Sequence, residues 1–149
     1  MNRRKFIKTA SLGAIAYAAL PNIGLAWEEI PSRTGKIIKG RKLNIACIGV
    51  GGQGWVDLQQ VASENIVAVC DVEATKIKAA LEKFPEARQY RDFRRMLMEM
   101  DDEIDAVTIT TPDHMHFPAA MMAIKMGKHV FVQKPMTHTI EEARALTAA

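Results

Sequence analysis

The sequence has few of the residues that hold disulfide-rich or metal-binding proteins together. Only two of its 149 residues are cysteines, Cys47 and Cys70. Each lies in a short apolar run, and no Cys or His spacing typical of a metal site is present. We therefore expect two buried thiols and no bound metal. A disulfide between them is the alternative, and it depends on whether the two strands place the sulfur atoms close together.

Basic residues are also scarce outside the N-terminal segment. The formal net charge is +3, from 20 Lys and Arg against 17 Asp and Glu. The first 26 residues contain no acid, and their basic side chains are Arg3, Arg4, Lys5 and Lys8. The rest of the chain is therefore close to neutral, which gives no indication of a nucleic-acid partner.

No apolar run is long enough to span a membrane. The longest, residues 10–20, is much shorter than the ~20 residues that a transmembrane helix needs. A charged start, a short apolar stretch and small residues at its end are typical of a signal peptide, here residues 1–26. Because Arg3-Arg4 resembles the twin-arginine signal, we expect the twin-arginine machinery to export the chain to the periplasm or beyond. An ordinary secretory signal and a simple basic tail are the alternatives.

Strands and helices alternate from Lys42 onward, after an arm or linker at residues 27–41. The segments that predict strands are residues 43–49, 66–71, 88–90, 105–110 and 129–133. Repeated strand–helix units predict a parallel sheet with right-handed crossovers. The expected fold class is α/β, a doubly wound Rossmann domain of three layers over residues 42–149.

Two of the predicted helices have specific start signals. The helix after Pro112 is expected to use Asp113 as its cap. Its predicted apolar face consists of Phe117, Met121 and Ile124. The last helix is expected to start with a capping box at residues 139–142, Thr-Ile-Glu-Glu.

A glycine-rich turn follows the first predicted strand. Its residues, which we call the glycine loop, are Gly49, Val50, Gly51, Gly52, Gln53 and Gly54. This G-x-G-x-x-G pattern, placed between a buried strand and a helix, predicts a dinucleotide site. Gly49 permits the tight turn, Gly51 lets the backbone approach a pyrophosphate, and Gly54 lets the helix pack on the strand. The helix N-terminus then offers free N–H groups to the anion.

An acid stands at the end of the second predicted strand. Asp71 lies 22 residues after Gly49, where a carboxylate accepts hydrogen bonds from the adenosine ribose. A carboxylate there repels a 2′-phosphate, so NAD is expected rather than NADP. The alternatives are a domain that binds S-adenosylmethionine or flavin, and a glycine turn beside a solvated acid.

Polar residues also follow the fourth and fifth predicted strands. Those that we expect beside the cofactor are Thr110, Thr111, Pro112, His116, Gln133, Lys134 and Pro135. Because ligands of open α/β sheets sit off the carboxyl ends of the strands, both groups should face the same crevice as the glycine loop.

The glycine loop, Asp71, the stretch TPDHMH from Thr111 and the stretch QKP from Gln133 together resemble the Gfo/Idh/MocA oxidoreductase family. The resemblance runs from about Lys42 to Ala149. It implies a second, C-terminal α/β domain that forms much of the substrate pocket and lies beyond this chain. It also implies a homo-oligomer once that domain is present, and a small sugar or polyol as substrate.

The resemblance implies roles for individual residues. Lys134 matches the lysine of the family's Glu-Lys-Pro signature and would take part in substrate binding and catalysis, while Gln133 stands where the family has Glu. Thr111, Pro112 and His116 match a T-P-x-x-x-H pattern that runs along the cofactor toward the nicotinamide. The expected reaction is NAD(P)-dependent hydride transfer at a carbinol carbon. The alternatives are an NAD-dependent glycosidase that acts by transient oxidation and elimination, and a non-catalytic dinucleotide-binding module.

Overall fold

The computed structural model describes residues 40–149, so the predicted signal peptide lies outside the described residues. Five strands form one sheet in the order β3-β2-β1-β4-β5, and all neighbouring pairs are parallel. The strands are β1 (Asn44–Ile48), β2 (Asn65–Cys70), β3 (Arg88–Tyr90), β4 (Ala106–Ile109) and β5 (His129–Val132). This order confirms the predicted doubly wound topology.

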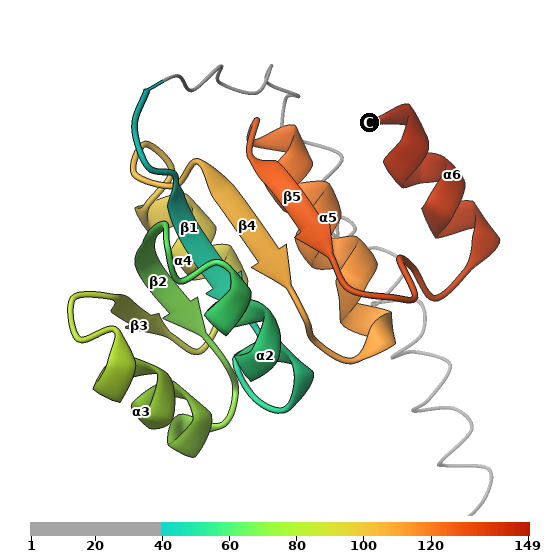
Figure 1. Cartoon of the computed structure of the whole chain (residues 1–149). Coiled ribbons are helices and arrows are strands. Elements are labelled where there is room, and N and C mark those ends of the chain that lie inside the picture. The colour runs from blue at the N-terminus through green and yellow to red at the C-terminus, as the bar shows by residue number, and fades with distance from the viewer. Residues whose placement is uncertain (1–39) are drawn as a thin grey trace, which may run out of the picture.

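Helices cover both faces of the sheet, which confirms three layers (Figure 1). One face carries α2 (Gln53–Gln60) and α3 (Ala74–Lys83), and the other carries α4 (Phe93–Glu99) and α5 (His116–Lys125). The last helix, α6 (Ile140–Ala148), packs beside α5 and begins with the predicted capping box between Thr139 and Glu142. Within residues 40–149, no helix combines the length and apolar character that crossing a bilayer requires.

The sheet separates two hydrophobic cores, and this separation settles the question of the two cysteines. Cys47 packs in the core under α2 and α3, whereas Cys70 packs in the core under α4 and α5. The two side chains therefore point to opposite faces of neighbouring strands, and both thiols are free. Burial raises the pKa of Cys47 to about 11 and that of Cys70 to about 12.

Helix α5 differs from the prediction in two respects. Phe117 and Ile124, assigned to its buried face, are only partly buried. The residues that it buries are His116, Pro118, Ala119, Ala120, Met121, Met122 and Ala123. This helix packs against the sheet, α4 and α6, so most of its circumference is covered. The predicted cap was also wrong: Asp113 lies in a short 3₁₀ turn, η1 (Asp113–Met115), and neither η1 nor α5 has a side-chain cap.

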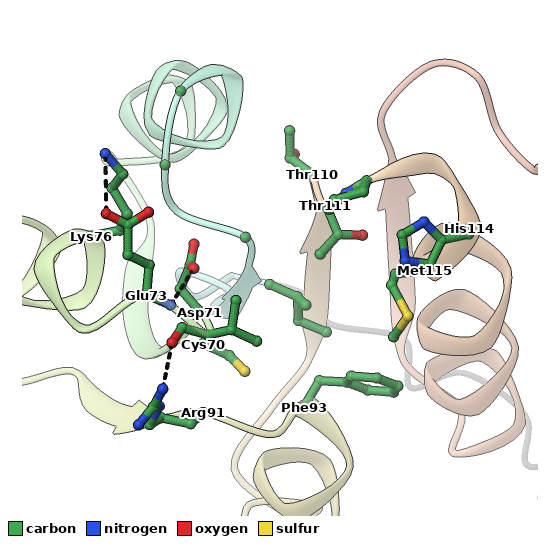
Figure 2. Close-up of a pocket in the computed structure, with 16 residues that line it drawn as sticks. Cys70, Asp71, Glu73, Lys76, Arg91, Phe93, Thr110, Thr111, His114 and Met115 are labelled. Atoms are coloured by element: carbon green, nitrogen blue, oxygen red, sulfur yellow. Dashed lines mark hydrogen bonds and ion pairs between the residues drawn. The ribbon is translucent and has the colours of Figure 1, made fainter.

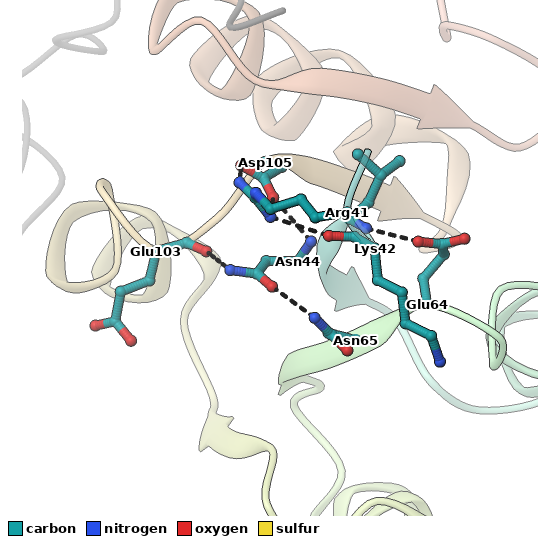
Figure 3. A network of polar contacts seen from close by, with 8 residues as sticks. Arg41, Lys42, Asn44, Glu64, Asn65, Glu103 and Asp105 are labelled. Carbon is teal, nitrogen blue, oxygen red and sulfur yellow. Dashed lines mark hydrogen bonds and ion pairs between the residues drawn. The ribbon is translucent and has the colours of Figure 1, made fainter. Parts of the chain in front are cut away.

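An ion pair fixes the chain where it enters β1 (Figure 3). The guanidinium of Arg41 donates to both carboxylate oxygens of the buried Asp105, at 2.7 and 2.9 Å. The backbone N–H of Asn44 donates to the same carboxylate at 2.9 Å. The hydrogen bonds that Arg41 donates to Asp105 raise the pKa of Arg41. Because Asp105 immediately precedes β4, these contacts tie the start of β1 to its neighbour in the sheet.

Candidate cofactor site

The strand order places a crevice between the carboxyl ends of β1 and β4, where connections run to opposite sides of the sheet. A cleft of about 620 Å³ opens there, within the size range of small-molecule and cofactor sites. Of the predicted site residues, those that line it are Gly49, Gly51, Gly52, Asp71, Thr110, Thr111 and Pro112. In Figure 2, Asp71 and the start of α3 form one side of the cleft and Thr110 and Thr111 form the other.

Two glycines of the loop are required by close packing. Gly49 has a φ of 78°, and a Cβ there would lie 2.3 Å from the carbonyl oxygen of Thr110. A Cβ on Gly54 would lie 2.1 Å from the carbonyl oxygen of Gly49. These distances are far inside van der Waals contact, so α2 starts against the backbone of β1 and β4 only because neither residue has a side chain.

The other two glycines leave the loop backbone open to a ligand. A Cβ on Gly52 would meet nothing within 4 Å, and a Cβ on Gly51 would meet only the flexible stem of Lys76, at 3.0 Å. Gly52 is also the N-cap of α2 and supplies no side-chain cap. Gly51 and Gly52 line the cleft directly before α2, so the positive dipole end of this helix lies beside it, an arrangement that fits a pyrophosphate.

Asp71 supports the loop in addition to lining the cleft. One carboxylate oxygen accepts a hydrogen bond from the N–H of Val50 at 2.9 Å, and the other accepts from the N–H of Glu73 at 2.9 Å. A carboxylate offers about four lone-pair sites, so acceptor capacity remains for ribose hydroxyls. The sequence predicted the ligand role alone. The contact with Val50 joins two segments 21 residues apart.

Charged residues that the sequence analysis did not single out also line the cleft. The ammonium of Lys76 lies 3.7 Å from a carboxylate oxygen of Glu73, and Arg91 donates to the carbonyl oxygen of Val72 at 2.8 Å. All follow β2 or β3 at the end of the sheet where Asp71 lies. The signal that points to them is their place just after strand ends, the same signal that identified Thr110 and Lys134.

His116 lies behind the cleft rather than in it. Its ring is 1% exposed and contacts the carbonyl oxygens of Pro135, at 2.6 Å, and Thr111, at 2.7 Å. Carbonyl oxygens only accept, so a neutral ring donates to one of them and a doubly protonated ring donates to both. The imidazole thus joins the segment after β4 to the segment after β5.

Gln133, Lys134 and Pro135 stand at the end of β5 and do not line this cleft. Lys134 is exposed, Gln133 is half-buried, and the Lys134–Pro135 peptide bond is cis. The side chain of Gln133 bonds the backbone N–H of Lys134 at 2.8 Å on one side and the carboxylate of Asp57 at 3.1 Å on the other.

Asp57 was missed by the sequence analysis. It lies one turn after Gln53 on α2, and its carboxylate accepts hydrogen bonds from Gln53 at 2.9 Å and Thr110 at 2.7 Å as well as from Gln133. Desolvation raises the pKa of Asp57, but the hydrogen bonds from these three side chains outweigh it, so the pKa lies below its ordinary value. The glycine-loop helix is thereby linked to both strand ends.

Comparisons with known proteins agree with this geometry. The model of the Gfo/Idh/MocA group, described as an oxidoreductase family with an NAD-binding Rossmann fold, matches residues 43–149. A glycosyl hydrolase family 109 protein of Shewanella amazonensis is 32% identical over 95% of this chain and 35% of its own length. An inositol 2-dehydrogenase of Salmonella typhimurium is 31% identical over 72% of this chain and 33% of its own length.

The solved structures give the same picture. The crystal structure of an NAD-binding protein from Listeria innocua is 31% identical, with a TM-score of 0.64 over 72% of this chain and 32% of that one. The chain therefore spans about a third of the length of the relatives that it matches.

Proposed function

The chain belongs to the Gfo/Idh/MocA oxidoreductase family, and from this premise we propose that it binds NAD in the cleft between β1 and β4 and presents Lys134 to a sugar or polyol. One observation carries the proposal. An open glycine loop, a helix N-terminus without a side-chain cap and a strand-end carboxylate meet between β1 and β4, where the strand order changes direction although all strands run parallel.

In this proposal the cofactor and the residues of the site have separate roles. A bound nicotinamide supplies the hydride chemistry, and the protein supplies binding, orientation and proton transfer. The N–H groups of Gly51 and Gly52 would hold the pyrophosphate, and Asp71 would accept hydrogen bonds from the adenosine ribose. Thr111 and Pro112 would lie along the cofactor toward the nicotinamide, and Lys134 would exchange the proton of the substrate hydroxyl.

The arrangement of charges supports NAD over NADP. Asp71 faces the cleft, and Glu73 lines the same wall. A 2′-phosphate placed on the ribose would meet these carboxylates. Two basic residues, Lys76 and Arg91, also line the cleft and could attract a 2′-phosphate. In our proposal they do not reverse the preference for NAD, because Lys76 lies beside the carboxylate of Glu73 and Arg91 already donates to the carbonyl oxygen of Val72.

Calorimetric titration of the whole chain with NAD and NADP tests the proposal. The parent chain should bind NAD more tightly. Asp71→Asn keeps an oxygen for the Val50 N–H but removes the charge, and should weaken NAD binding by roughly 10- to 150-fold, the worth of a charge-assisted hydrogen bond. Asp102→Asn, the same change at an exposed turn, is the control and should leave both affinities unchanged. Equal affinity of the parent for the two dinucleotides would contradict the preference.

A second candidate activity rests on one comparison. The family 109 relative matches 95% of this chain, more than the inositol dehydrogenase does. Glycosidase action through transient oxidation uses bound NAD without net turnover. Release of a chromophore from an aryl glycoside with no added NAD would therefore favour the glycosidase over the dehydrogenase, whereas stoichiometric formation of NADH from a polyol would favour the dehydrogenase.

We also propose that the chain is exported by the twin-arginine pathway. Arg3-Arg4 and the short apolar run that follows support this proposal. Export of an already folded domain would let NAD bind before the protein leaves the compartment in which the dinucleotide is made.

A further inference from the structure

Within residues 40–149, the carboxylate of Asp57 has three side-chain donors around it and no cation among them. They come from its own helix, from the end of β4 and from the end of β5, and they are Gln53, Thr110 and Gln133. A further titratable neighbour is the thiol of Cys47 on β1, which stays neutral because burial raises its pKa to about 11. Asp57 is thus a single negative charge held by neutral hydrogen-bond donors.

The carboxylate of Asp57 determines which side chain at position 133 can satisfy its hydrogen-bonding neighbours. Carboxylate oxygens only accept hydrogen bonds, so the amide nitrogen of Gln133 must face Asp57. The amide oxygen then faces the backbone N–H of Lys134 and accepts from it at 2.8 Å. A glutamine satisfies both neighbours at once. An ionised glutamate would satisfy Lys134 but would bring a second negative charge against Asp57, at the 3.1 Å that separates the two side chains here.

We propose that Asp57 is a positioning residue for the segment after β5, which it holds through the amide of Gln133, and that positions 57 and 133 together require one carboxylate and one amide. The inference rests on the proposed function, in which bound NAD lies beside this segment. It also gives a reason for Gln133 in a signature that carries Glu in the family that the sequence resembles. In this chain the negative charge is on Asp57 of α2, and the amide of Gln133 links that carboxylate to the backbone N–H of Lys134.

The pair predicts a specific pattern of rescue. Gln133→Glu alone should weaken NAD binding by about 3- to 10-fold at pH 8, a modest effect because the pair is only half-buried. At pH 5.5 the loss should shrink, because two facing carboxylates take up a shared proton as pH falls. Adding Asp57→Asn to Gln133→Glu should restore the parent affinity to within about 2-fold at both pH values. In that double variant the new amide on α2 donates and the new carboxylate at the end of β5 accepts.

A matched control separates the pair from a general change in charge. Asp102 is exposed, and Asp102→Asn removes the same charge elsewhere. Combined with Gln133→Glu, it should leave the loss and its pH dependence in place. A residue with a merely structural role would lower thermal stability without pH-dependent affinity, and the two changes at positions 57 and 133 would then simply add.

The experiment is therefore NAD titration of the parent chain and these variants at two pH values, with urea unfolding beside it. Rescue by Asp57→Asn but not by Asp102→Asn supports the pair. Additive effects, or equal rescue by both, overturn it. If the parent chain binds no NAD, the proposed function fails, and the same variants are then compared by their urea midpoints. Rescue confined to Asp57→Asn would still support the pair, and additive midpoints would overturn it.

Discussion

At the scale of single residues, Lys134 carries the main chemical prediction. It is exposed at the end of β5, so its removal should cost the fold little. In a form of the protein that includes a substrate domain, Lys134→Met should leave NAD binding within a few-fold. It should slow single-turnover reduction of bound NAD by about 10²–10⁴, the usual worth of a positioned acid or base.

The control for this prediction is another exposed lysine. Lys78→Met on α3 makes the same change away from the cleft and should alter neither rate nor binding. A Lys134→Met protein that keeps its full rate but melts at a lower temperature would show that the lysine supports the fold and handles no proton.

The two thiols give a prediction about pH. Because burial raises the pKa of Cys47 and Cys70 to about 11 and about 12, both stay protonated in the folded chain at pH 8 and should resist iodoacetamide. After unfolding in guanidinium, both should be alkylated, as mass spectrometry would show. Rapid labelling of the folded chain, or a disulfide-linked peptide pair, would contradict their placement in separate cores.

The same shifts set the sign of their effect on stability. A thiol whose pKa is raised in the fold makes its full contribution to the free energy of unfolding while the pH is below its ordinary pKa of 9.0. That contribution falls as pH rises from there toward the folded values. The free energy of unfolding should therefore decline above about pH 9, and a Cys47→Ala, Cys70→Ala double variant should show less of this decline.

At the scale of elements, different glycines of the glycine loop serve packing and ligand binding. A Cβ on Gly54 would collide with the backbone of Gly49 at 2.1 Å, whereas a Cβ on Gly51 would meet only a flexible lysine stem. Gly54→Ala should therefore destabilise the domain by about 1–3 kcal/mol or more, because backbone must move. Gly51→Ala should keep the stability nearly unchanged but weaken NAD binding by about 10-fold or more, because the new methyl group enters the path of the pyrophosphate.

Urea unfolding and calorimetry of the two variants check this contrast. Gly51→Ala serves as the control for Gly54→Ala, since both add one methyl group to the same loop. If Gly51→Ala binds NAD as well as the parent does, the loop does not approach the ligand at that residue.

Most elements could be predicted because their signals are local. The strand that ends in the glycine loop and the capping box at Thr139 each depend on residues within one short stretch, and both are present. The burial of α5 could not be predicted, because it depends on α4 and α6 packing around the helix. The cap at Asp113 failed for a related reason: η1 intervenes between Pro112 and α5.

The candidate site shows the same division. Asp71 was identified from its distance along the chain after a glycine motif. Asp57 was not, because the contact that gives it meaning reaches Gln133, 76 residues away. Only its spacing from Gln53, one helical turn, is visible in the sequence, and such a pair is common on exposed helix surfaces.

At the scale of the whole molecule, the proposed export route is open to direct test. Replacing Arg3 and Arg4 together by lysine keeps the charge of the segment but removes the arginine pair. We expect the full-length precursor to remain in the cytoplasm, as seen by cell fractionation and immunoblotting. The parent chain should appear outside in a form shorter by the first 26 residues. Undiminished appearance of that shorter form from the lysine variant would rule out the twin-arginine assignment.

The placement of β1 also predicts that the two ends of the domain resist a pulling force unequally. This strand lies between two parallel neighbours, and Arg41 and Asp105 brace the chain where it enters. A pull on the chain ahead of Arg41, directed along the strand, loads two ladders of backbone hydrogen bonds in shear, so many must break together. A pull from the other terminus meets α6, which buries none of its residues, and then the edge strand β5. Under tension the domain should therefore resist at its N-terminal side and peel from its C-terminal side, one element at a time.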